Sequence, residues 1–412
     1  EISACLVGSE MCIRDRYYGE LIIMKKSGPK ELKFINYKRY IIVLSVLLTA
    51  LISINIMFRV STVFAQAYCT AVYPNVVKVM GAVSSLAPFS IIEILIYVAA
   101  AIVIYAIVRL IITLVHNHSK ASICFFTYRL KKYLLNLACI VIVCLLILSF
   151  NCTILYHRLS FTVCANMELE AHSVDELAAL FKIIADDAAD LSDKVERDSN
   201  GVFTTGSLDV NELCVDAMHA VRQSYPFMTD YYPHAKPILA SKLMSATGME
   251  GFYSPFTMEA NYNSDIPDID IPHTICHELA HLSGFIHEDE ANFIGYAACM
   301  ASDSESLRYS ASVEMLIYVM NELYNNLSSE HYSELISTLD RGVITDLNAQ
   351  GKYWREAGNM FGGSLNDAVQ SANDTYIKLN GDAEGDVRYS MVTELLIDYY
   401  SDKIDEILDA DK

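Results

Sequence analysis

Three long apolar runs stand out in the first part of this 412-residue chain, over residues 40–58, 91–115 and 133–156. Each run approaches or exceeds the ~20 residues that a helix needs to cross the hydrocarbon core of a bilayer. Three such runs within about 120 residues are typical of membrane spans and rare in a soluble fold. The pattern therefore predicts three transmembrane helices.

Beyond residue 157 the pattern becomes that of amphipathic helices. Apolar residues recur at helical spacing in segments 175–195, 208–221, 304–327 and 393–408. The segment 248–264, GMEGFYSPFTMEANYNS, differs because its glycines, aromatic residues and proline favour an extended conformation with turns. We therefore expect a mainly α fold, in which three N-terminal transmembrane helices precede a mostly helical domain with a small strand element.

The same pattern divides the chain into three parts. Residues 1–23 read poorly as a protein start, and their SEMCIRDR stretch resembles translated adapter sequence, whereas MKKSGPKELKF from Met24 is typical of a bacterial N-terminus. We expect 1–23 to be a non-native leader, 24–157 a membrane domain and 158–412 an outer domain. The loop from Arg59 to Ser90 is itself apolar, and the sequence leaves open whether it lies along the membrane or packs on the outer domain.

Basic residues predict how the spans are oriented. They are frequent before the first span and between the second and third, whereas the loop between the first and second carries only Arg59 and Lys78. The two basic groups are Lys25, Lys26, Lys30, Lys33, Lys38 and Arg39, and Lys120, Arg129, Lys131 and Lys132. Cytoplasmic loops carry an excess of Lys and Arg, so we expect a multi-pass protein of the bacterial cell membrane with its N-terminus in the cytoplasm and its outer domain extracytoplasmic.

Charge and cysteine content narrow the class of protein further. The mean hydropathy of +0.28 reflects the apolar runs, and the net charge of −20 falls mostly on the second half of the chain. An acidic domain repels phosphate backbones, so we expect the lipid bilayer but no nucleic acid as a partner. The eleven cysteines are scattered without a CxxC pair, which does not indicate a disulfide framework.

The residues with the clearest chemistry lie in HTICHELAHLSGFIHEDEANF, which contains an HExxH motif formed by His277, Glu278 and His281. On a helix, residues four apart share a face, so both imidazoles can bind one ion. Glu278 is offset by one position and can reach a water on the metal. Zinc lowers the pKa of such a water to ~7, and a carboxylate can accept its proton during attack on a carbonyl. Two histidines and one carboxylate would leave a fourth position open, so we expect a catalytic Zn²⁺ site with Glu278 as the general base.

Two alternatives are open for the third metal ligand. HELAHLSGFIH fits the HExxHxxGxxH pattern of the metzincins, which would make His287 the ligand, although their downstream methionine turn has no convincing counterpart. EDEAN resembles the ExxAD-like segment of the gluzincins, in which Glu288 would be the ligand and Asn292 would support a ligand histidine. Along a straight helix at ~1.5 Å per residue, Glu288 would lie about 10 Å from His281, so a break at Gly284 is required.

The chain also resembles a bacterial family labelled as a domain of unknown function. The likeness lies in GFYSPFTMEANYN, PHTICHELAH, EDEANFIGYAAC, Tyr73-Pro74, Pro88-Phe89-Ser90 and the late stretch YIKLNG, and covers most of the chain from the first span onward. The resemblance implies a membrane-anchored, gluzincin-like protein of the HExxH zinc metallopeptidase type, and with it a zincin-like outer domain. EDEAN is typical of the family, whereas the position of His287 is often not histidine. The resemblance thus favours Glu288 over His287 as the third ligand, with Glu290 a further candidate.

Together these features predict one function and leave one alternative. The leading hypothesis is a membrane-anchored zinc metallopeptidase that hydrolyses peptide or protein substrates with a water activated by Glu278. The alternative is a non-catalytic, membrane-anchored metal-binding sensor or scaffold, against which Glu278 counts because a structural site needs no general base. We expect His273 to be a solvated loop residue. We expect His219, His234 and His331 to be ordinary surface residues, because none of them has a partner in the sequence.

Overall fold

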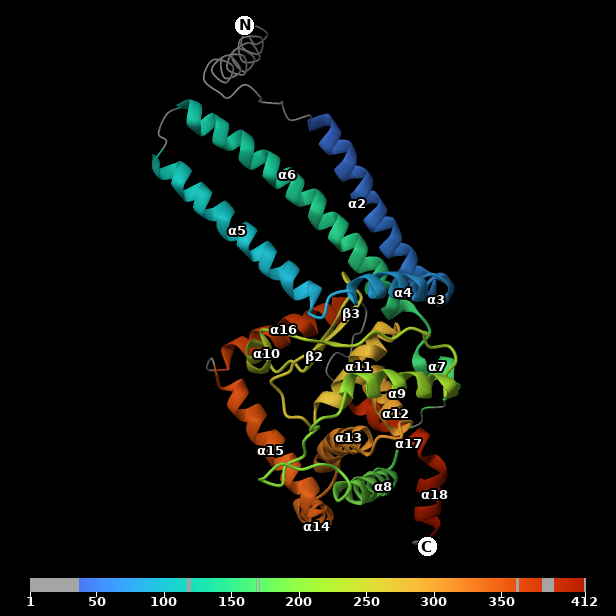
Figure 1. Cartoon of the computed structure of the whole chain (residues 1–412). Helices are drawn as coiled ribbons and strands as arrows, with labels where there is room; N and C mark the ends of the chain where they lie inside the picture. Colours follow the sequence, from blue (N-terminus) through green and yellow to red (C-terminus); the bar gives the residue numbers. More distant parts are fainter. Residues whose placement is uncertain are drawn as a thin grey trace. The chain divides into compact units, whose positions relative to one another are not determined.

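The computed structural model describes residues 37–116, 120–167, 169, 171–360, 363–379 and 389–410. The expected leader, 1–23, and the basic residues Lys25, Lys26, Lys30 and Lys33 lie outside these ranges. The chain divides into two compact units (Figure 1). The first contains residues up to Ile54 together with Ile94–Ile147, and the second contains Asn55–Glu93 and the chain from Leu148 onward.

The three apolar runs form helices, as predicted. These helices are α2 (Tyr37–Val60), α5 (Ile91–His116) and α6 (Lys120–Asn151), and each is long and apolar enough to cross a membrane. The third apolar run is not helical to its end, because the residues after Asn151 form a 3-10 turn, η1 (Thr153–His157), whose first three side chains are buried.

The second unit is mostly helical, as predicted. Its central elements are α11 (Ile271–Leu282) and α12 (Glu288–Met300), which are buried on nearly all sides. Both pack against α9 (Val210–Ser224) and α13 (Glu305–Asn326). The unit's other helices after residue 158 are α7 (Phe161–Ala165), α8 (Val174–Ser192), α10 (Ser241–Ala246), α14 (Ser329–Ile336), α15 (Arg341–Gly358), α16 (Ser364–Leu379), α17 (Tyr389–Tyr399) and α18 (Ser401–Ala410).

A three-stranded sheet covers one side of α11. Its strands are β1 (Lys236–Pro237), β2 (Gly251–Ser254) and β3 (Glu259–Tyr262), in the order β1-β3-β2. β2 and β3 are antiparallel, with Gly251 opposite Tyr262 and Ser254 opposite Glu259, whereas β1 runs parallel to β3. The prediction of an extended segment with turns at 248–264 is therefore confirmed. β2 lies at the edge of the sheet and faces the helix that carries the HExxH motif.

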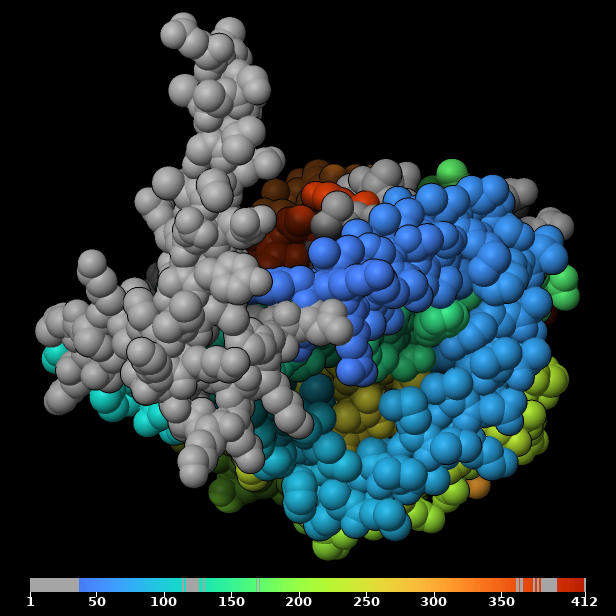
Figure 2. Space-filling model, turned by 90° about the horizontal axis from the view of Figure 1, so that it is seen from above, coloured from blue at the N-terminus to red at the C-terminus, as the bar shows by residue number. Residues whose placement is uncertain are grey.

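The loop between the first two apolar helices belongs to the second unit, so one of the two placements left open by the sequence, packing on the outer domain, is observed. We call residues 61–90 the strap. The strap forms α3 (Thr62–Ala71) and α4 (Tyr73–Ser84), and the side chain of Ser61 caps α3 by accepting a hydrogen bond from Phe64 N. One face of the strap is buried, including Tyr73 and Val77. Figure 2 shows the strap in light blue as a continuous band on the face viewed from above.

Two boundaries differ from those expected from sequence. The second compact unit begins before residue 158, since it includes the strap and Leu148–His157. The helix predicted over 393–408 is interrupted, because α17 ends at Tyr399 and α18 begins at Ser401. At this break the Tyr400 hydroxyl lies 2.7 Å from that of Tyr296 on α12. This tertiary contact has no counterpart in the helical pattern of the sequence.

Candidate metal centre

The start of helix α11 is held by buried polar contacts. Asp270 lies at the N-cap and Pro272 in the first turn, where the missing N–H of proline costs no helical hydrogen bond. The Asp270 carboxylate accepts hydrogen bonds from Gln350 Nε2 at 2.7 Å and from Trp354 Nε1 at 3.0 Å. These two contacts from α15 fix the position of the helix that carries the HExxH motif.

The break between α11 and α12 occurs at Gly284, as required. Gly284 has a φ of +97°, which residues with a Cβ rarely adopt. A Cβ at this position would lie 2.9 Å from Arg158 Nη1, and that guanidinium donates a hydrogen bond to the Gly284 carbonyl at 3.0 Å. The chain reverses here and enters α12 at Glu288, so that the first turn of α12 faces the last turns of α11.

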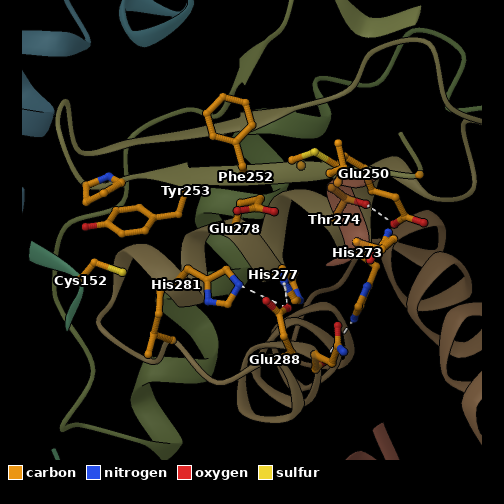
Figure 3. Close-up of a pocket in the computed structure, with 18 of the residues that line it drawn as sticks. Cys152, Glu250, Phe252, Tyr253, His273, Thr274, His277, Glu278, His281 and Glu288 are labelled. Atoms are coloured by element: carbon orange, nitrogen blue, oxygen red, sulfur yellow. Dashed lines mark hydrogen bonds and ion pairs between the residues drawn. The ribbon is translucent and has the colours of Figure 1, made fainter. Parts of the chain in front are cut away.

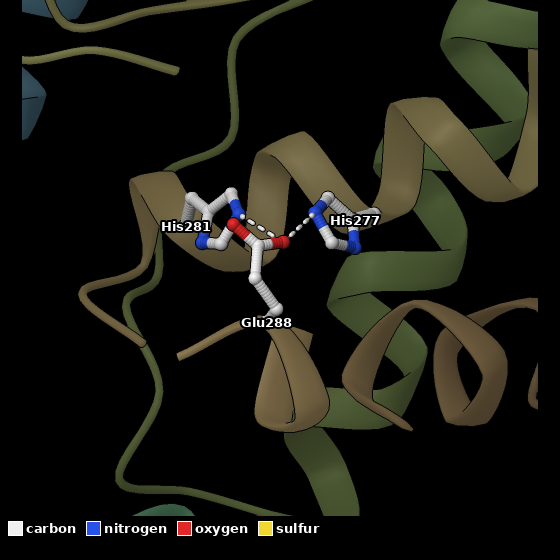
Figure 4. A group of neighbouring side chains, drawn as sticks. All are labelled: His277, His281 and Glu288. Atoms are coloured by element: carbon white, nitrogen blue, oxygen red, sulfur yellow. Dashed lines mark ion pairs between the residues drawn. The ribbon is translucent and has the colours of Figure 1, made fainter. Parts of the chain in front are cut away.

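Three potential ligand atoms meet at this reversal (Figure 4). Glu288 Oε2 lies 3.2 Å from His277 Nε2 and 3.6 Å from His281 Nε2. One ligand atom from each of the three residues lies within 4.8 Å of the other two. The Glu288 side chain is 41% exposed, compared with 14% for His277 and 8% for His281. The cluster is therefore fixed in the core on its histidine side and open on its glutamate side.

Each histidine of the cluster is oriented by a hydrogen bond to another residue. His281 Nδ1 lies 2.9 Å from Phe285 O. Because a carbonyl only accepts, Nδ1 carries a proton, so in the neutral imidazole the lone pair is on Nε2, the nitrogen that faces the cluster. His277 shares a side-chain hydrogen bond with Asn292, whose Nδ2 donates to the Tyr318 hydroxyl at 3.1 Å. Asn292 thus occupies the supporting position expected for it from the EDEAN segment.

Burial and mutual charge determine the protonation of the cluster. Burial, together with the nearby His281, lowers the pKa of His277. Burial also disfavours protonation of His281, but the Glu288 carboxylate outweighs this and raises the pKa of His281 to about 9. The two imidazoles in turn hold the pKa of Glu288 well below its usual range, against the effect of burial. The arrangement favours a positive charge beside an ionised carboxylate, at the point where a metal cation would bind.

Glu278 faces the same cavity as the cluster (Figure 3). Its carboxylate is buried, and Oε2 makes no hydrogen bond to any residue that the structure describes. Burial raises the pKa of Glu278 to about 8, with His281 opposing this shift and Glu288 adding to it. A Cβ on Gly251 of β2 would lie 2.6 Å from Glu278 Oε1, so the bare glycine leaves room for this carboxylate.

The cavity around the cluster has a volume of about 730 Å³, within the usual range for ligand pockets. Its walls come from helices α11, α12, α13 and α16 and from strand β2 with the turns on either side of it. The end of α6 and the residues that follow it complete the wall. The residues that line it include Leu148, Cys152, Tyr156, Glu250, Gly251, Phe252, Tyr253, Phe256, His273, Thr274, His277, Glu278, His281, Glu288, Asn292, Glu314, Tyr318 and Gln370.

Glu288 is the candidate third ligand whose side chain reaches both imidazoles. His287 instead precedes α12 as its N-cap residue, and its ring packs edge-on against Tyr156 with centroids 5.3 Å apart. Glu290 is buried on another side of α12, where its Oε1 accepts a hydrogen bond from Phe161 N at 2.6 Å. The geometry therefore favours Glu288 over His287 and Glu290.

The expectation for His273 was wrong. It is a buried residue of α11 that lines the cavity, with Nε2 3.2 Å from Asn292 O, and burial lowers its pKa to about 3. Sequence suggested a loop because acidic residues and prolines precede it, but α11 already begins at Ile271. The exposed positions of His219, His234 and His331 agree with prediction.

Other side chains in the cavity could not be predicted from the sequence. Glu250 and Glu314 both line it although they lie far apart in the chain. Burial and the Glu250 carboxylate together raise the pKa of Glu314 to about 8. Tyr318, which bonds Asn292, lies on the same helix as Glu314. The packing of α13 against α11 brings Glu314 and Tyr318 to the site, and the packing of β2 against α11 brings Glu250, so no motif spacing predicts them.

Comparison with known proteins identifies one family. The family described as "Protein of unknown function (DUF3810)" matches residues 68–397. This range includes most of the strap, two of the three apolar helices, the sheet and the whole cluster of candidate metal ligands. No curated protein and no solved structure matches the chain.

Proposed function

The chain belongs to the DUF3810 family, a family of unknown function, and we propose that it is a membrane-anchored zinc metallopeptidase whose active site lies outside the cytoplasm. The observation that carries this proposal is the convergence of His277, His281 and Glu288 beside the buried carboxylate of Glu278. The three apolar helices supply the anchor, and the distribution of basic residues supports the orientation.

The side chains in the cluster fit a zinc ion. Two imidazole nitrogens and one carboxylate oxygen are the donor set of many catalytic zinc sites, which keep one position open for water or substrate. The proton on His281 Nδ1 is held by Phe285 O, which leaves Nε2 available as a donor. The exposure of Glu288 toward the cavity leaves a side from which water and substrate can approach.

In this proposal each residue of the site has one task. Zinc, when bound, acts as a Lewis acid toward the substrate carbonyl and makes water more acidic. Glu278 accepts a proton from the attacking water and delivers it to the leaving amine; in support of this role, its Oε2 bonds no residue of the described ranges and so is free to take up a proton. Asn292 and Phe285 O keep the imidazoles of His277 and His281 oriented.

The substitution Glu278→Gln tests this mechanism. It preserves the shape of the side chain but removes the proton acceptor, so we expect the full-length variant to keep its zinc while hydrolysis falls by about 10²–10⁴-fold. Zinc is measured by elemental analysis of the detergent-purified protein, and hydrolysis with a library of fluorogenic peptides. Turnover equal to that of the wild type would refute the assigned role of Glu278.

The same experiment distinguishes the metallopeptidase from a metal-binding scaffold. A scaffold would hold zinc and lose thermal stability when zinc is chelated, yet the zinc-loaded wild type would cut no peptide of the library. The metallopeptidase predicts cleavage by the zinc-loaded wild type that stops on chelation and returns when zinc is restored.

A further inference from the structure

We propose that the substrate of this site is a polypeptide tethered to the same bilayer, cut in the extracytoplasmic segment next to its membrane anchor. This inference rests on the proposed peptidase function and adds the substrate class to it. It depends on the cavity and on the outer ends of the membrane spans, which belong to the same compact unit.

The outer ends of the three spans can be located by counting residues. With ~20 residues needed to cross the hydrocarbon core, a span that starts at Tyr40 ends near Arg59, and one that starts after Lys132 ends near Cys152. The second span begins at Ile91. The second unit contains Asn55–Glu93 and the chain from Leu148 onward, so it includes the outer end of every span. The bilayer surface therefore meets this unit at three points.

A short series of contacts connects one of these points to the catalytic helix. Tyr253 on β2 donates its hydroxyl to Asn151 O, at the end of α6, at 2.9 Å. The Tyr253 hydroxyl also lies 3.0 Å from that of Tyr73 in the strap, which in turn lies 3.3 Å from Leu282 O. Leu282 directly follows His281 in the chain. Only two tyrosine side chains thus separate the end of the third span from the end of the HExxH helix.

The cavity itself extends to the same level. Leu148 and Cys152, at the outer end of the third span, line it together with His281 and Glu288. Phe256, in the turn between β2 and β3, also lines the cavity and is 37% exposed. The wall of the cavity nearest the span end is therefore largely apolar.

The strap provides an independent reason to place this side of the unit against lipid. Its outward side chains include Val63, Val79, Val83 and Leu86, which are 81%, 65%, 62% and 85% exposed. Lys78 is the only charged residue between Ser61 and Ser90, and the strap is joined at both ends to membrane spans. An apolar face on such a segment is suited to lie in the bilayer interface. We assign the bilayer as the partner of this face.

A cavity at this level favours tethered substrates over soluble ones. A polypeptide that leaves the bilayer beside the enzyme presents its first extracytoplasmic residues at the height of the cluster, at a high effective concentration. A bond far from the anchor, held away from the surface by a rigid spacer, cannot reach the cluster.

The test uses the full-length, zinc-loaded protein in phospholipid vesicles with a series of anchored peptides. Each peptide carries a synthetic transmembrane helix, a helical EAAAK-repeat spacer of variable length and a segment of randomised sequence. The same peptides without the anchor serve as the matched control. Mass spectrometry locates the cleaved bonds, and we expect cuts in the randomised segment when it lies within about 10 residues of the anchor, or ~15 Å of helix. The cleavage rate should fall at least about 10-fold with longer spacers.

Each outcome decides one question. Cuts confined to bonds near the anchor support the inference. Equal cleavage with long and short spacers, or of unanchored peptides at the same rate, overturns the inference but leaves the peptidase function intact. If no peptide of either set is cut, the peptidase function fails, and the inference fails with it.

A second measurement does not depend on catalysis. A photoreactive amino acid placed at Leu86 of the Glu278→Gln variant should form adducts with the vesicle lipid. The same group at Tyr324 on α13, which is 65% exposed, should form none. Lipid adducts at Tyr324 but not at Leu86 would contradict the assigned placement of the strap.

Discussion

The Glu288 carboxylate lies between two imidazoles with different surroundings, since His281 is held by Phe285 O and His277 by Asn292. This one side chain completes the cluster and leaves its open side toward the cavity. At the residue scale, the identity of the third ligand is therefore the most direct question that the site raises.

We expect Glu288→Ala to weaken zinc binding by more than about 100-fold, because even the loss of a group that only supports a ligand typically costs 10–100-fold. Competition with a chelator of known affinity measures the change. His287→Ala is the matched control, since its ring packs on Tyr156 away from the cluster, and it should keep the affinity of the wild type. The reverse result, loss of zinc in the His287 variant alone, would identify the metzincin arrangement instead.

Glu314 predicts how stability depends on pH. Burial and Glu250 raise its pKa from 4.5 to about 8. Between these two pH values the Glu314 carboxyl is therefore protonated in the folded protein and ionised in the unfolded chain. This contribution to stability is fully present below about pH 4.5 and is lost as the pH rises through about 8. Glu314→Gln should therefore melt at a higher temperature than the wild type at pH 8 and at a similar temperature near pH 4.5.

The measurement for Glu314 is thermal unfolding of the full-length protein, followed by circular dichroism across this pH range. Glu334→Gln on α14 removes the same charge at an exposed position and serves as the control, which should leave the pH dependence as in the wild type. An unchanged pH profile in the Glu314 variant would show that this carboxyl does not take up a proton on folding.

At the element scale, the site depends on the reversal between α11 and α12. Gly284 adopts a positive φ, and the two helices then approach closely: a Cβ on Gly295 would lie 3.1 Å from His277 N. Two glycines thus allow the helix with the histidines and the helix with Glu288 to pack side by side. The close packing of α11 and α12, rather than the spacing along the chain, brings Glu288 to His277 and His281.

We expect Gly284→Ala to destabilise the domain by about 1–2 kcal/mol, the usual cost of a left-handed conformation for a residue with a Cβ. The same change should lower zinc affinity because Glu288 would shift relative to the histidines. Chemical unfolding and chelator competition measure the two effects. Gly358→Ala at the end of α15 is the control, since a Cβ there would meet no atom within 4 Å, and it should be neutral or slightly stabilising.

At the scale of the whole molecule, a buried ion pair within the sheet also holds the strap and the start of the second apolar helix. Lys236 Nζ lies 2.5 Å from Glu259 Oε1, and the same carboxylate accepts hydrogen bonds from Ile91 N and Ile92 N, each at 3.0 Å. Lys236 also donates to Ser84 O at 2.6 Å. The start of the second apolar helix, the strap and a strand that packs on the HExxH helix therefore share one polar junction.

Glu259→Ala should destabilise the full-length protein by about 3–5 kcal/mol, because it leaves the ammonium of Lys236 buried without a counter-charge. Chemical unfolding in detergent measures the loss. Glu212→Ala breaks an exposed pair with His234 and should cost no more than about 1 kcal/mol. Similar small effects from both variants would mean that the Lys236 ammonium reaches water once its partner is removed.

Sequence and structure agree best where the information is local. The apolar runs predicted α2, α5 and α6, and the residues of 248–264 predicted the strand pair. His277 and His281 share a helix face because they lie four residues apart, and Gly284 marked the break. The position of His273 was missed, since burial against Asn292 on another helix is not visible in the residues around it.

By itself, the sequence determined the apolar helices, the paired histidines and the glycine reversal, because each depends on hydrophobic pattern or backbone geometry within a few residues. Only the tertiary structure decided that Glu288, and not His287 or Glu290, faces the histidines, and that the strap and the end of the third apolar helix belong to the compact unit that holds the cluster. Those outcomes depend on how α12, the strap and the sheet pack around α11, through contacts between residues up to about two hundred positions apart, such as Tyr73 and Leu282.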